Sequence, residues 1–215
     1  MVEIVSIEGN IGSGKSTVID TLRLSYKANK NVYFLNEPVN EWTQIQDCNG
    51  ENIIEKFYAD QEKYSFSFQM MAYISRLSML KRAIKYCKEC NIKLIICERT
   101  LQTDKNVFCK MLYDCNKIED VNYQIYLKWF DEFIFDIPQI YFVYIKTDPK
   151  IANQRVIKRN RKGERISLEY LEMCSNYHDA WLNNFNSENT VLVDGNGLAG
   201  NTYDITNNII KKIIN

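Results

Sequence analysis

The sequence predicts an α/β protein with a doubly wound, five-stranded parallel sheet flanked by helices. Five short β-rich runs alternate with longer helical patterns, at residues 2–7 (VEIVSI), 31–35 (NVYFL), 93–97 (KLIIC), 140–145 (IYFVYI) and 190–193 (TVLV). Their nearly continuous apolar character is typical of strands that are buried on both faces of a sheet. Ligands of such sheets bind beyond the carboxyl ends of the strands, so the residues that follow each run are the first candidates for a site.

The first strand is followed by the sequence GNIGSGKS, which matches the pattern G-x-x-x-x-G-K-[ST]. In this pattern the glycines let backbone N–H groups turn toward phosphates, and the next helix points its positive end at them. Lys15 then reaches the outer phosphates, and Ser16 offers a hydroxyl to Mg²⁺. An ordinary glycine-rich turn is the alternative, but strand, loop and helix occur in the required order. The predicted nucleoside triphosphate site comprises Gly9, Asn10, Ile11, Gly12, Ser13, Gly14, Lys15, Ser16 and Thr17.

Length, composition and charge favour one domain that spans residues 1–215. With 46% hydrophobic residues the chain can bury a sizeable core, and no Pro/Gly/Ser-rich linker divides it. Lys plus Arg and Asp plus Glu number 27 each, so we expect neither nucleic acid nor a membrane as a partner. No apolar run approaches the ~18 residues of a membrane span. Seven scattered cysteines predict free thiols, and we expect a cytoplasmic protein.

Cys87 and Cys90 form a C-x-x-C pair, a spacing that also occurs in zinc sites. A zinc site needs further ligands, but the sequence has no second pair, and its single histidine, His178, lies far along the chain. We therefore interpret the two cysteines as part of a helix. His178 is likewise interpreted as a helix residue and not as a catalytic base.

The longest helical pattern runs from about Gln61 to Cys90. Its apolar stripe predicts a core or inter-helix seam and comprises Phe66, Met70, Tyr73, Leu77, Leu80, Ile84 and Cys87. Gln69 and Arg76 lie seven residues apart beside this stripe, so they share a face and stand ~10 Å apart along the axis. Each alone could be a solvated polar residue, but together they are candidates for one pocket.

Two acidic residues follow predicted strands. Glu98 ends the third strand, where an enzyme with this loop commonly needs a carboxylate near its metal, and Arg99 beside it would neutralise phosphate. A surface ion pair is the alternative for these two residues. Glu37 precedes Pro38, which favours an extended conformation and would let the carboxylate face the nucleotide.

An arginine-rich segment follows the fourth strand. A Thr-Asp-Pro sequence at residues 147–149 predicts a helix start, because Asp caps a helix and proline suits its first turn. Arg155 and Arg159 then lie one turn apart on one face, and Arg161 follows in RNRKGER. A solvated charged face is the usual interpretation of such a run, but this cluster stands out in a chain of zero net charge. We predict a lid over residues 155–167 that closes on phosphates.

The chain contains, in this order, IEGNIGSGKST, EPVNEW, YSFSFQMMAYISRL, ERTLQTD and RNRKGERISLEYL. In order and spacing these segments resemble the deoxyribonucleoside kinase family, which includes deoxycytidine, deoxyguanosine and mitochondrial thymidine kinases. The resemblance spans roughly residues 2–181. It implies a P-loop kinase fold and a homodimer that transfers the γ-phosphoryl group of ATP, or another NTP, to the 5′-hydroxyl of a deoxyribonucleoside. Mg²⁺ would assist the transfer, and the role would be nucleotide salvage.

The resemblance also implies catalytic roles. Glu37 resembles the general base for the 5′-hydroxyl, and Arg99 the arginine that holds that end of the substrate. Glu98 is similar to the magnesium-associated carboxylate, which joins Ser16 as a metal ligand. A carboxylate with an ordinary pKa can serve as this base, because the hydroxyl loses its proton only as the phosphoryl group arrives. Charge neutralisation is expected from Lys15 and from the lid arginines Arg155, Arg159 and Arg161.

For the bound deoxyribonucleoside, the resemblance implies a second set of residues. Gln69 resembles the residue that hydrogen-bonds the base edge, Phe108 the ring that stacks on the base, and Trp42 another wall of the pocket. Tyr58 and Glu164 resemble the pair that reads the 3′-hydroxyl, and the tyrosine would leave little space for a ribose 2′-hydroxyl.

Base preference is expected to depend on Arg76 and Asp104. Family members that use deoxycytidine or deoxypurines carry an arginine and an aspartate at the matching positions, so we expect deoxycytidine or a deoxypurine ahead of thymidine. The lid departs from the family pattern. Relatives usually show two adjacent acidic residues there, whereas here Gly163 precedes Glu164 and the loop is one residue shorter.

Two other functions are alternatives to a deoxyribonucleoside kinase. A nucleoside monophosphate kinase, such as a thymidylate kinase, has a similar sheet and lid, but Glu37 would repel the phosphate of its acceptor. A nucleotide-binding subunit without catalysis is the second alternative. It would have no need to retain Lys15, Ser16, Glu37, Glu98 and Arg99 together.

Overall fold

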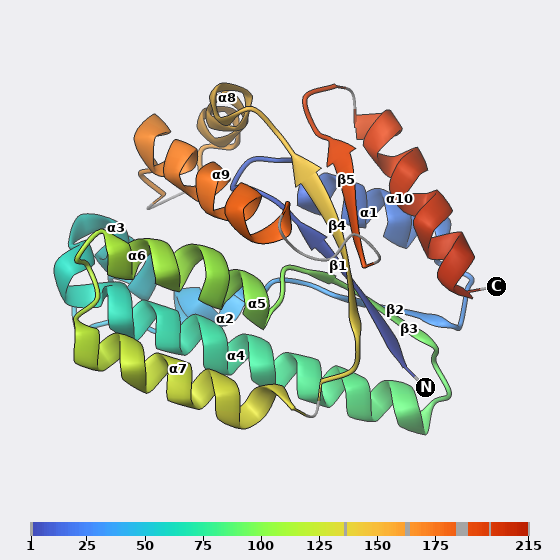
Figure 1. The fold of residues 1–215 in the computed structure, drawn as a ribbon, viewed down its shortest axis with the longest axis horizontal. Coiled ribbons are helices and arrows are strands. Elements are labelled where there is room, and N and C mark those ends of the chain that lie inside the picture. The colour runs from blue at the N-terminus through green and yellow to red at the C-terminus, as the bar shows by residue number, and fades with distance from the viewer. Residues whose placement is uncertain (1, 136, 162–163, 184–188, 198, 215) are drawn as a thin grey trace.

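Five parallel strands form one sheet in the order β2-β3-β1-β4-β5 (Figure 1). The computed structural model describes residues 2–135, 137–161, 164–183, 189–197 and 199–214. The strands are β1 (Glu3–Glu8), β2 (Val32–Leu35), β3 (Leu94–Glu98), β4 (Ile140–Lys146) and β5 (Thr190–Asp194). The predicted parallel sheet is therefore confirmed, with strand ends that differ from the predicted ones by at most one residue.

Strand β1 lies at the centre of the sheet, where Ile4 is paired with Ile95 of β3 and with Ile140 of β4. Successive side chains of a strand point to opposite faces. Val5 and Ile7 belong to the core cluster that contains residues of α1 (Lys15–Ser25) and α10 (Ala199–Ile214). These two helices lie side by side and cover one face of the sheet (Figure 1).

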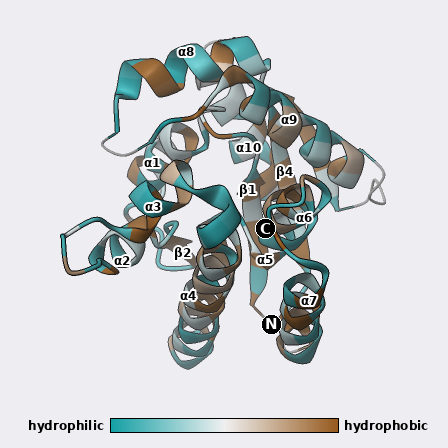
Figure 2. Ribbon diagram, turned by 90° about the vertical axis from the view of Figure 1, so that its left-hand side faces the viewer, coloured by the Kyte–Doolittle hydropathy of each residue, from teal (hydrophilic) through white to brown (hydrophobic). Residues whose placement is uncertain are grey.

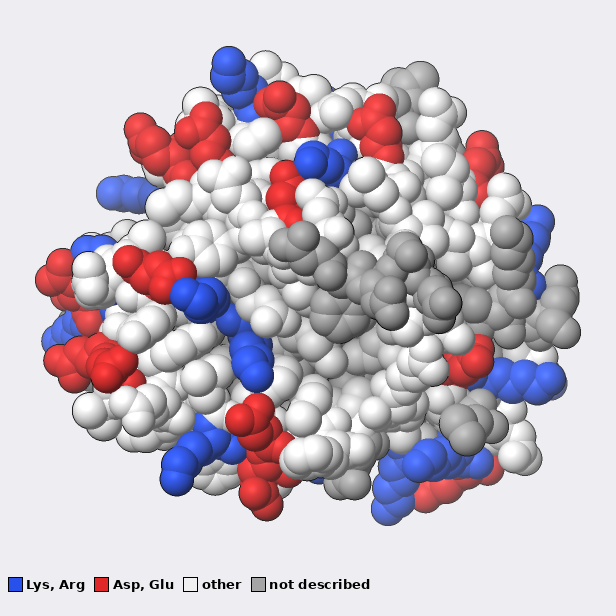
Figure 3. Space-filling model, in the orientation of Figure 1, with Lys and Arg blue, Asp and Glu red and all other residues white. Residues whose placement is uncertain are grey.

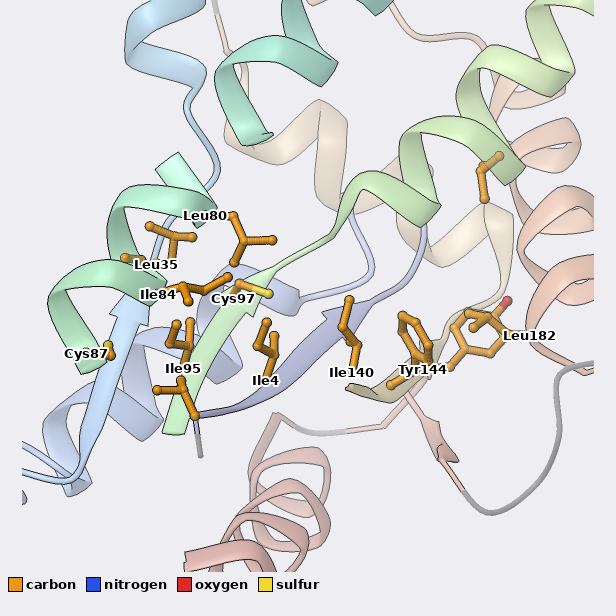
Figure 4. Packing of buried hydrophobic residues seen from close by; sticks show 14 of the residues in the cluster. Ile4, Leu35, Leu80, Ile84, Cys87, Ile95, Cys97, Ile140, Tyr144 and Leu182 are labelled. Carbon is orange, nitrogen blue, oxygen red and sulfur yellow. The ribbon is translucent and has the colours of Figure 1, made fainter. Parts of the chain in front are cut away.

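The opposite face packs mainly against α4 (Gln61–Glu89) and α9 (Leu168–Leu182). Leu80 and Ile84 of α4 contact the sheet near Ile4 and Ile95, as Figure 4 shows. The predicted apolar stripe of this helix is confirmed. Tyr73, Leu77, Leu80, Ile84 and Cys87 are buried, and Phe66 and Met70 are partly buried.

The other helices on this side are α3 (Ile53–Ala59), α5 (Leu101–Thr103), the π-helical turn η1 (Asp104–Cys109), α6 (Lys110–Asp114) and α7 (Asp120–Ile134). Of these, α3, α5, η1 and α7 contact α4, and η1 and α6 contact α9. Figures 1 and 2 both show α4 and α7 running side by side. They are joined by Tyr73, whose hydroxyl donates to the carbonyl oxygen of Trp129 at 2.8 Å. Because α5 and η1 follow β3 directly in the chain, they lie at the carboxyl edge of the sheet.

The remaining helices, α2 (Val39–Gln44) and α8 (Pro149–Arg159), follow β2 and β4. As predicted, α8 begins with a capping Asp148 and a proline in its first turn. All seven cysteines are free thiols, and His178 is buried in α9. On the face drawn in Figure 3, positive and negative side chains are interspersed. In the part of the chain that the structure describes, no helix combines the length and apolar character of a membrane span.

Candidate active site

The phosphate-binding loop connects β1 to α1 and depends on its glycines. Gly12 and Gly14 have φ values of 80° and 98°, which side chains other than glycine rarely adopt. A Cβ on Gly12 would also overlap the carbonyl oxygen of Ala152 in α8. Asn10 fastens the loop to α9, because its Nδ2 donates to the carbonyl oxygen of Leu171 at 2.7 Å.

Lys15 is the buried cation of this loop, with 4% of its surface exposed. Its Nζ donates to the carbonyl oxygen of Asn10 at 2.8 Å and lies 3.9 Å from the Glu98 carboxylate. Burial, followed by the nearby charge of Arg99, lowers the pKa of Lys15 to about 7. An anion beside Nζ would favour the charged form, because opposite charge offsets the desolvation. The loop is therefore suited to a phosphate group.

Ser16 and Glu98 place a hydroxyl and a carboxylate side by side. Ser16 Oγ donates to the two Glu98 carboxylate oxygens at 3.0 and 3.2 Å. Mg²⁺ prefers oxygen ligands and often takes only one or two from protein, with the rest from phosphates and water. Among the described residues, no cluster of three or more His, Cys, Asp or Glu side chains could hold a metal ion. The pair fits a magnesium ion that shares its ligands with a nucleotide.

Glu37, between β2 and α2, is held by two arginines. Arg99 Nη1 lies 3.0 and 3.2 Å from the two carboxylate oxygens, and Arg76 Nη2 lies 3.0 Å from one of them. Arg99 adopts a φ of 61°, which is uncommon for a residue with a side chain. Its Nη2 donates to the carbonyl oxygen of Gly9 at 3.2 Å, so the same side chain joins Glu37 to the phosphate loop.

The two guanidinium groups control the acidity of Glu37. Burial raises the pKa of this carboxyl, but the charges of Arg99, Arg76 and Lys15 outweigh burial and lower the pKa to about 2. The Glu37 carboxyl is therefore more acidic than an ordinary carboxyl. The sequence places Glu37 and Arg99 after neighbouring strands, but it does not reveal that Arg76 approaches the same carboxylate from α4.

Arg76 and Asp104 form a buried ion pair between α4 and η1. Arg76 Nε and Nη2 donate to the two oxygens of Asp104 at 2.8 and 3.3 Å, and Arg76 Nη1 donates to the carbonyl oxygen of Glu98 at 3.1 Å. The side chains are 6% and 3% exposed. Burial raises the pKa of Asp104, and the Arg76 charge opposes that rise. Arg76 thus connects the aspartate to Glu37.

A cavity of about 520 Å³ joins the phosphate loop to these residues. Gln69 and Arg76 both line it, as their spacing on α4 predicts. Gln69 is buried, and its Oε1 has no hydrogen-bond partner, so this oxygen is available to a ligand. Phe108 lies with its ring 5.2 Å from Arg99 Cζ, and Trp42 Nε1 donates to Ser75 Oγ at 2.9 Å. The cavity combines aromatic walls with a few fixed polar groups, as small-molecule sites do.

The arginines of the predicted lid meet an acidic residue at the cavity. Arg159 Nε donates to a carboxylate oxygen of Glu164 at 3.0 Å, and Arg161 Nη1 lies 3.7 Å from the other oxygen. Glu164 and Tyr58 line the same cavity. Residues 162 and 163 of the predicted lid lie outside the described residues, and the closing of a lid stays a prediction.

Arg155 braces the phosphate loop, because its guanidinium donates to the carbonyl oxygens of Ser13 at 3.2 Å and Gly195 at 2.9 Å. Among the predicted site residues, Gly9, Asn10 and Ser13 lie behind the cavity lining. The others line the cavity: Ile11, Gly12, Gly14, Lys15, Ser16, Thr17, Glu37, Trp42, Tyr58, Gln69, Arg76, Glu98, Arg99, Asp104, Phe108, Arg155, Arg159, Arg161 and Glu164.

Sequence reasoning missed several residues of the site. Phe68 and Tyr170 line the cavity, and Phe68 stacks on Phe57 with ring centroids 4.6 Å apart. Aromatic residues in an amphipathic helix are typical of a core, so the sequence gives no signal for them. Glu8, buried under the loop, was also missed. The sequence does carry a signal for Glu8, because an acidic residue at the end of an apolar strand is a candidate for a site.

Comparisons with known proteins agree with this geometry. The model of the family "Deoxynucleoside kinase" matches residues 5–215. Deoxycytidine kinase 1 of Xenopus laevis is 31% identical over 199 residues, which cover 84% of this chain and 74% of that protein. Deoxycytidine kinase 2 of Gallus gallus is 31% identical over 208 residues (88% and 76%), and mitochondrial thymidine kinase 2 of Homo sapiens is 31% identical over 182 residues (83% and 64%). The chain belongs to the deoxynucleoside kinase family.

Proposed function

We propose that this protein transfers the γ-phosphoryl group of ATP, or another nucleoside triphosphate, to the 5′-hydroxyl of a deoxyribonucleoside in nucleotide salvage. The observation that carries the proposal is one cavity lined both by Lys15 of the phosphate loop and by Glu37. A phosphate donor and a hydroxyl acceptor can meet in such a cavity. The names of the relatives, deoxycytidine kinase and thymidine kinase 2, support a deoxynucleoside acceptor.

Phosphoryl transfer requires positioning and charge neutralisation more than covalent help from the protein. Lys15 and Arg159 offset charge on the transferring group, and Arg99 holds the acceptor end. Glu37 orients the 5′-hydroxyl and accepts its proton. With a pKa of about 2, Glu37 is ionised at neutral pH. Such a weak base takes the proton late, once the hydroxyl oxygen has begun to bond to phosphorus.

Ser16 and Glu98 are the proposed protein ligands of Mg²⁺. Their oxygens lie 3.0 Å apart at the start of α1 and the end of β3. A magnesium ion held by Ser16 and Glu98 would offset charge on the phosphates of the donor. Arg155 keeps the loop beneath it in place through Ser13.

The proposed substrate is deoxycytidine or a deoxypurine ahead of thymidine. Asp104 can accept a hydrogen bond from an exocyclic amine, which cytosine and adenine carry, whereas thymine presents a carbonyl oxygen there. Gln69 adds an unpartnered amide oxygen at the same wall. A mismatch of buried polar groups costs roughly 1–3 kcal/mol, or about 10- to 100-fold in selectivity. Phe108 and Trp42 flank the base, while Tyr58 and Glu164 hold the 3′-hydroxyl.

A thymidylate-like kinase is disfavoured by Glu37. An acceptor phosphate would meet an ionised carboxylate, and like charges at such a site disfavour binding. A non-catalytic subunit is disfavoured because the phosphate loop, Glu37 and the Ser16–Glu98 pair share one cavity. An assay of ATP with the four deoxynucleosides and with thymidylate separates these functions. Phosphorylation of deoxycytidine or deoxyadenosine is expected to be fastest. Faster turnover of thymidylate, or ATP binding without any transfer, would overturn the proposal.

We further propose a homodimer that associates through α7 and α4. Val121, Ile125 and Trp129 lie at spacings of four on α7, and they are 66%, 40% and 45% exposed. Ile74 on the adjoining α4 is 52% exposed. A stripe of this kind is typical of an interaction surface. Sedimentation equilibrium should show a dimer that Trp129→Lys converts to a monomer, and a monomeric wild-type protein would contradict this assignment.

We also propose that residues 1–215 form one domain and that the protein is cytoplasmic. Residues from four strand ends contribute to the one cavity, which supports a single folding unit. The seven free cysteines support a reducing compartment. Limited proteolysis should give no smaller stable fragment.

A further inference from the structure

Glu8 is a buried carboxylate that the proposed reaction does not use. It is the last residue of β1 and is fully buried. Its Oε1 accepts from Ser6 Oγ at 2.5 Å and from Thr100 Oγ1 at 3.4 Å, and its Oε2 accepts from Thr103 Oγ1 at 2.6 Å. A carboxylate in a protein core is costly unless its hydrogen bonds are satisfied. The three hydroxyl groups satisfy it here.

The network of Glu8 fixes the turn that follows β3. Thr103 Oγ1 donates to Glu8 and also accepts from the backbone N–H of Thr100 at 3.2 Å. That second bond is part of the capping box that starts α5. The carboxylate therefore ties both ends of residues 100–103 to the central strand.

This turn lies between two residues of the acceptor site. Arg99 precedes it and Asp104 follows it, and both line the cavity. The backbone N–H of Arg99 donates to Ile7 at 3.2 Å, and its Nη2 donates to Gly9 at 3.2 Å. The residues on either side of Glu8, Ile7 of β1 and Gly9 of the phosphate loop, thus hold Arg99, while Glu8 holds the residues that follow Arg99.

We propose that Glu8 is a positioning residue for phosphoryl transfer. By fastening residues 100–103 to β1, it sets the places of Arg99 and Asp104 relative to the phosphate loop. The inference rests on the proposed function. Its physical reason is that Arg99 has an uncommon left-handed backbone, which persists only where the surroundings enforce it. A shift of ~1 Å in such a group can lower a rate by about 10²-fold.

Two substitutions remove the network from opposite sides. Glu8→Gln replaces the carboxylate with an amide of similar shape, and Thr103→Val removes the hydroxyl while keeping the side-chain volume. Each should lower kcat by about tenfold or more, with the KM for ATP changed by less than about threefold. The double variant should be no slower than the worse single variant, because both break the same connection. Thr103→Ser restores the hydroxyl and should restore kcat.

Ser6→Ala is the matched control. It removes a hydrogen bond to the same carboxylate from within β1 and leaves the turn untouched. Its kcat should fall less than that of Thr103→Val, because no hydrogen bond between Glu8 and residues 100–103 is removed. If Ser6→Ala loses as much kcat as Thr103→Val, or if Thr103→Val keeps wild-type kcat, Glu8 does not position the site. Should Glu8→Gln not fold, a wild-type kcat in Thr103→Val still refutes the proposal, because that variant lacks the bond between residue 103 and Glu8.

Hydrogen exchange separates this inference from the proposed function. The amides of residues 100–103 should exchange faster in Glu8→Gln and Thr103→Val than in the wild type, but not in Ser6→Ala. A wild-type protein that phosphorylates no deoxynucleoside refutes the proposed function. The exchange rates then still test whether Glu8 fastens residues 100–103 to β1. An active wild type whose variants match it in both kcat and exchange refutes the inference about Glu8.

Discussion

Arg99 binds Glu37 through a single guanidinium nitrogen, Nη1, which donates to the two carboxylate oxygens at 3.0 and 3.2 Å. Its other terminal nitrogen is bound to the backbone of Gly9. Arg99 therefore links the acceptor-side carboxylate to the first residue of the phosphate loop, while Arg76 holds the same carboxylate from α4. A substitution in the phosphate loop should therefore disturb Glu37, and a substitution of Glu37 should disturb the phosphate loop.

Glu37→Gln should lower the single-turnover rate by about 10²-fold or more while deoxynucleoside binding is retained, because the amide keeps the shape but cannot take up the proton. Binding is measured by calorimetry and turnover by rapid quench. Glu41→Gln, an exposed carboxylate on α2, is the control and should have little effect. A Glu37→Gln rate within a few-fold of the wild type would remove Glu37 from the base role.

Lys15 should take up a proton when a nucleotide binds. Its pKa of about 7 leaves it mostly neutral at pH 8, and a bound phosphate favours the charged form. Calorimetry in buffers of different ionisation enthalpy should show uptake of close to one proton at pH 8 and affinity that weakens as pH rises above 7. The free protein should gain stability from pH 7 toward 10.5, because only the unfolded chain keeps this proton there.

Lys15→Arg provides the control for this measurement. Arginine stays protonated at every pH of the experiment, so nucleotide binding to the variant should take up no proton at this position. Equal uptake by Lys15→Arg and the wild type would assign the proton to another group.

Arg159→Ala should reduce kcat by about 10²-fold and weaken deoxynucleoside binding much less, because the guanidinium is needed most as charge develops during transfer. Arg159 is bound to Glu164 at the cavity, so the variant also frees that carboxylate. Lys158→Ala, the exposed neighbour, should stay within about threefold of the wild type. Steady-state kinetics of both variants provide the comparison, and parallel losses would speak against a specific role of Arg159.

Replacing Arg76 and Asp104 together should shift base preference toward thymidine. The two must change as a pair, because Arg76→Met alone would leave the buried Asp104 carboxylate without its partner. Arg76→Met with Asp104→Ala should raise the ratio of kcat/KM for thymidine over deoxycytidine by about tenfold or more. The ratio is the proper readout, since Arg76 also holds Glu37. A wild-type enzyme that already prefers thymidine would overturn the argument.

The strands and the long helix α4 could be predicted because their signals are local. Apolar runs bounded by polar residues identify strands, and the Asp148 cap with Pro149 marks the start of α8. Gln69 and Arg76 could be assigned to one pocket because seven residues make two helical turns. These features depend on the spacing of residues within one element.

The partners of each charged side chain could not be predicted in the same way. Arg76 and Glu37 are 39 residues apart, and their contact depends on how α4 packs against the sheet. The same holds for Arg155, which binds the loop at Ser13 and the segment after β5 at Gly195. Glu8 lies on the same face of β1 as Ile4, but only the packed helices decide that this face is closed to solvent. Tertiary packing sets acidity and hydrogen bonding, which is why the low pKa of Glu37 could not be predicted from the sequence.

The order of strands in the sheet has a consequence for how the chain assembles during synthesis. Strand β1 pairs with β3 and β4, with Ile4 beside Ile95 and Ile140, so its central place stays open until both later strands have emerged from the ribosome. Contacts so distant in sequence form slowly, because the intervening chain must close a long loop first. The phosphate-binding loop is therefore translated early, but the sheet that supports it is complete only after β3 and β4 have paired with β1. β1 has two unpaired edges until β3 emerges and one until β4 emerges, which gives a chaperone reason to cover it.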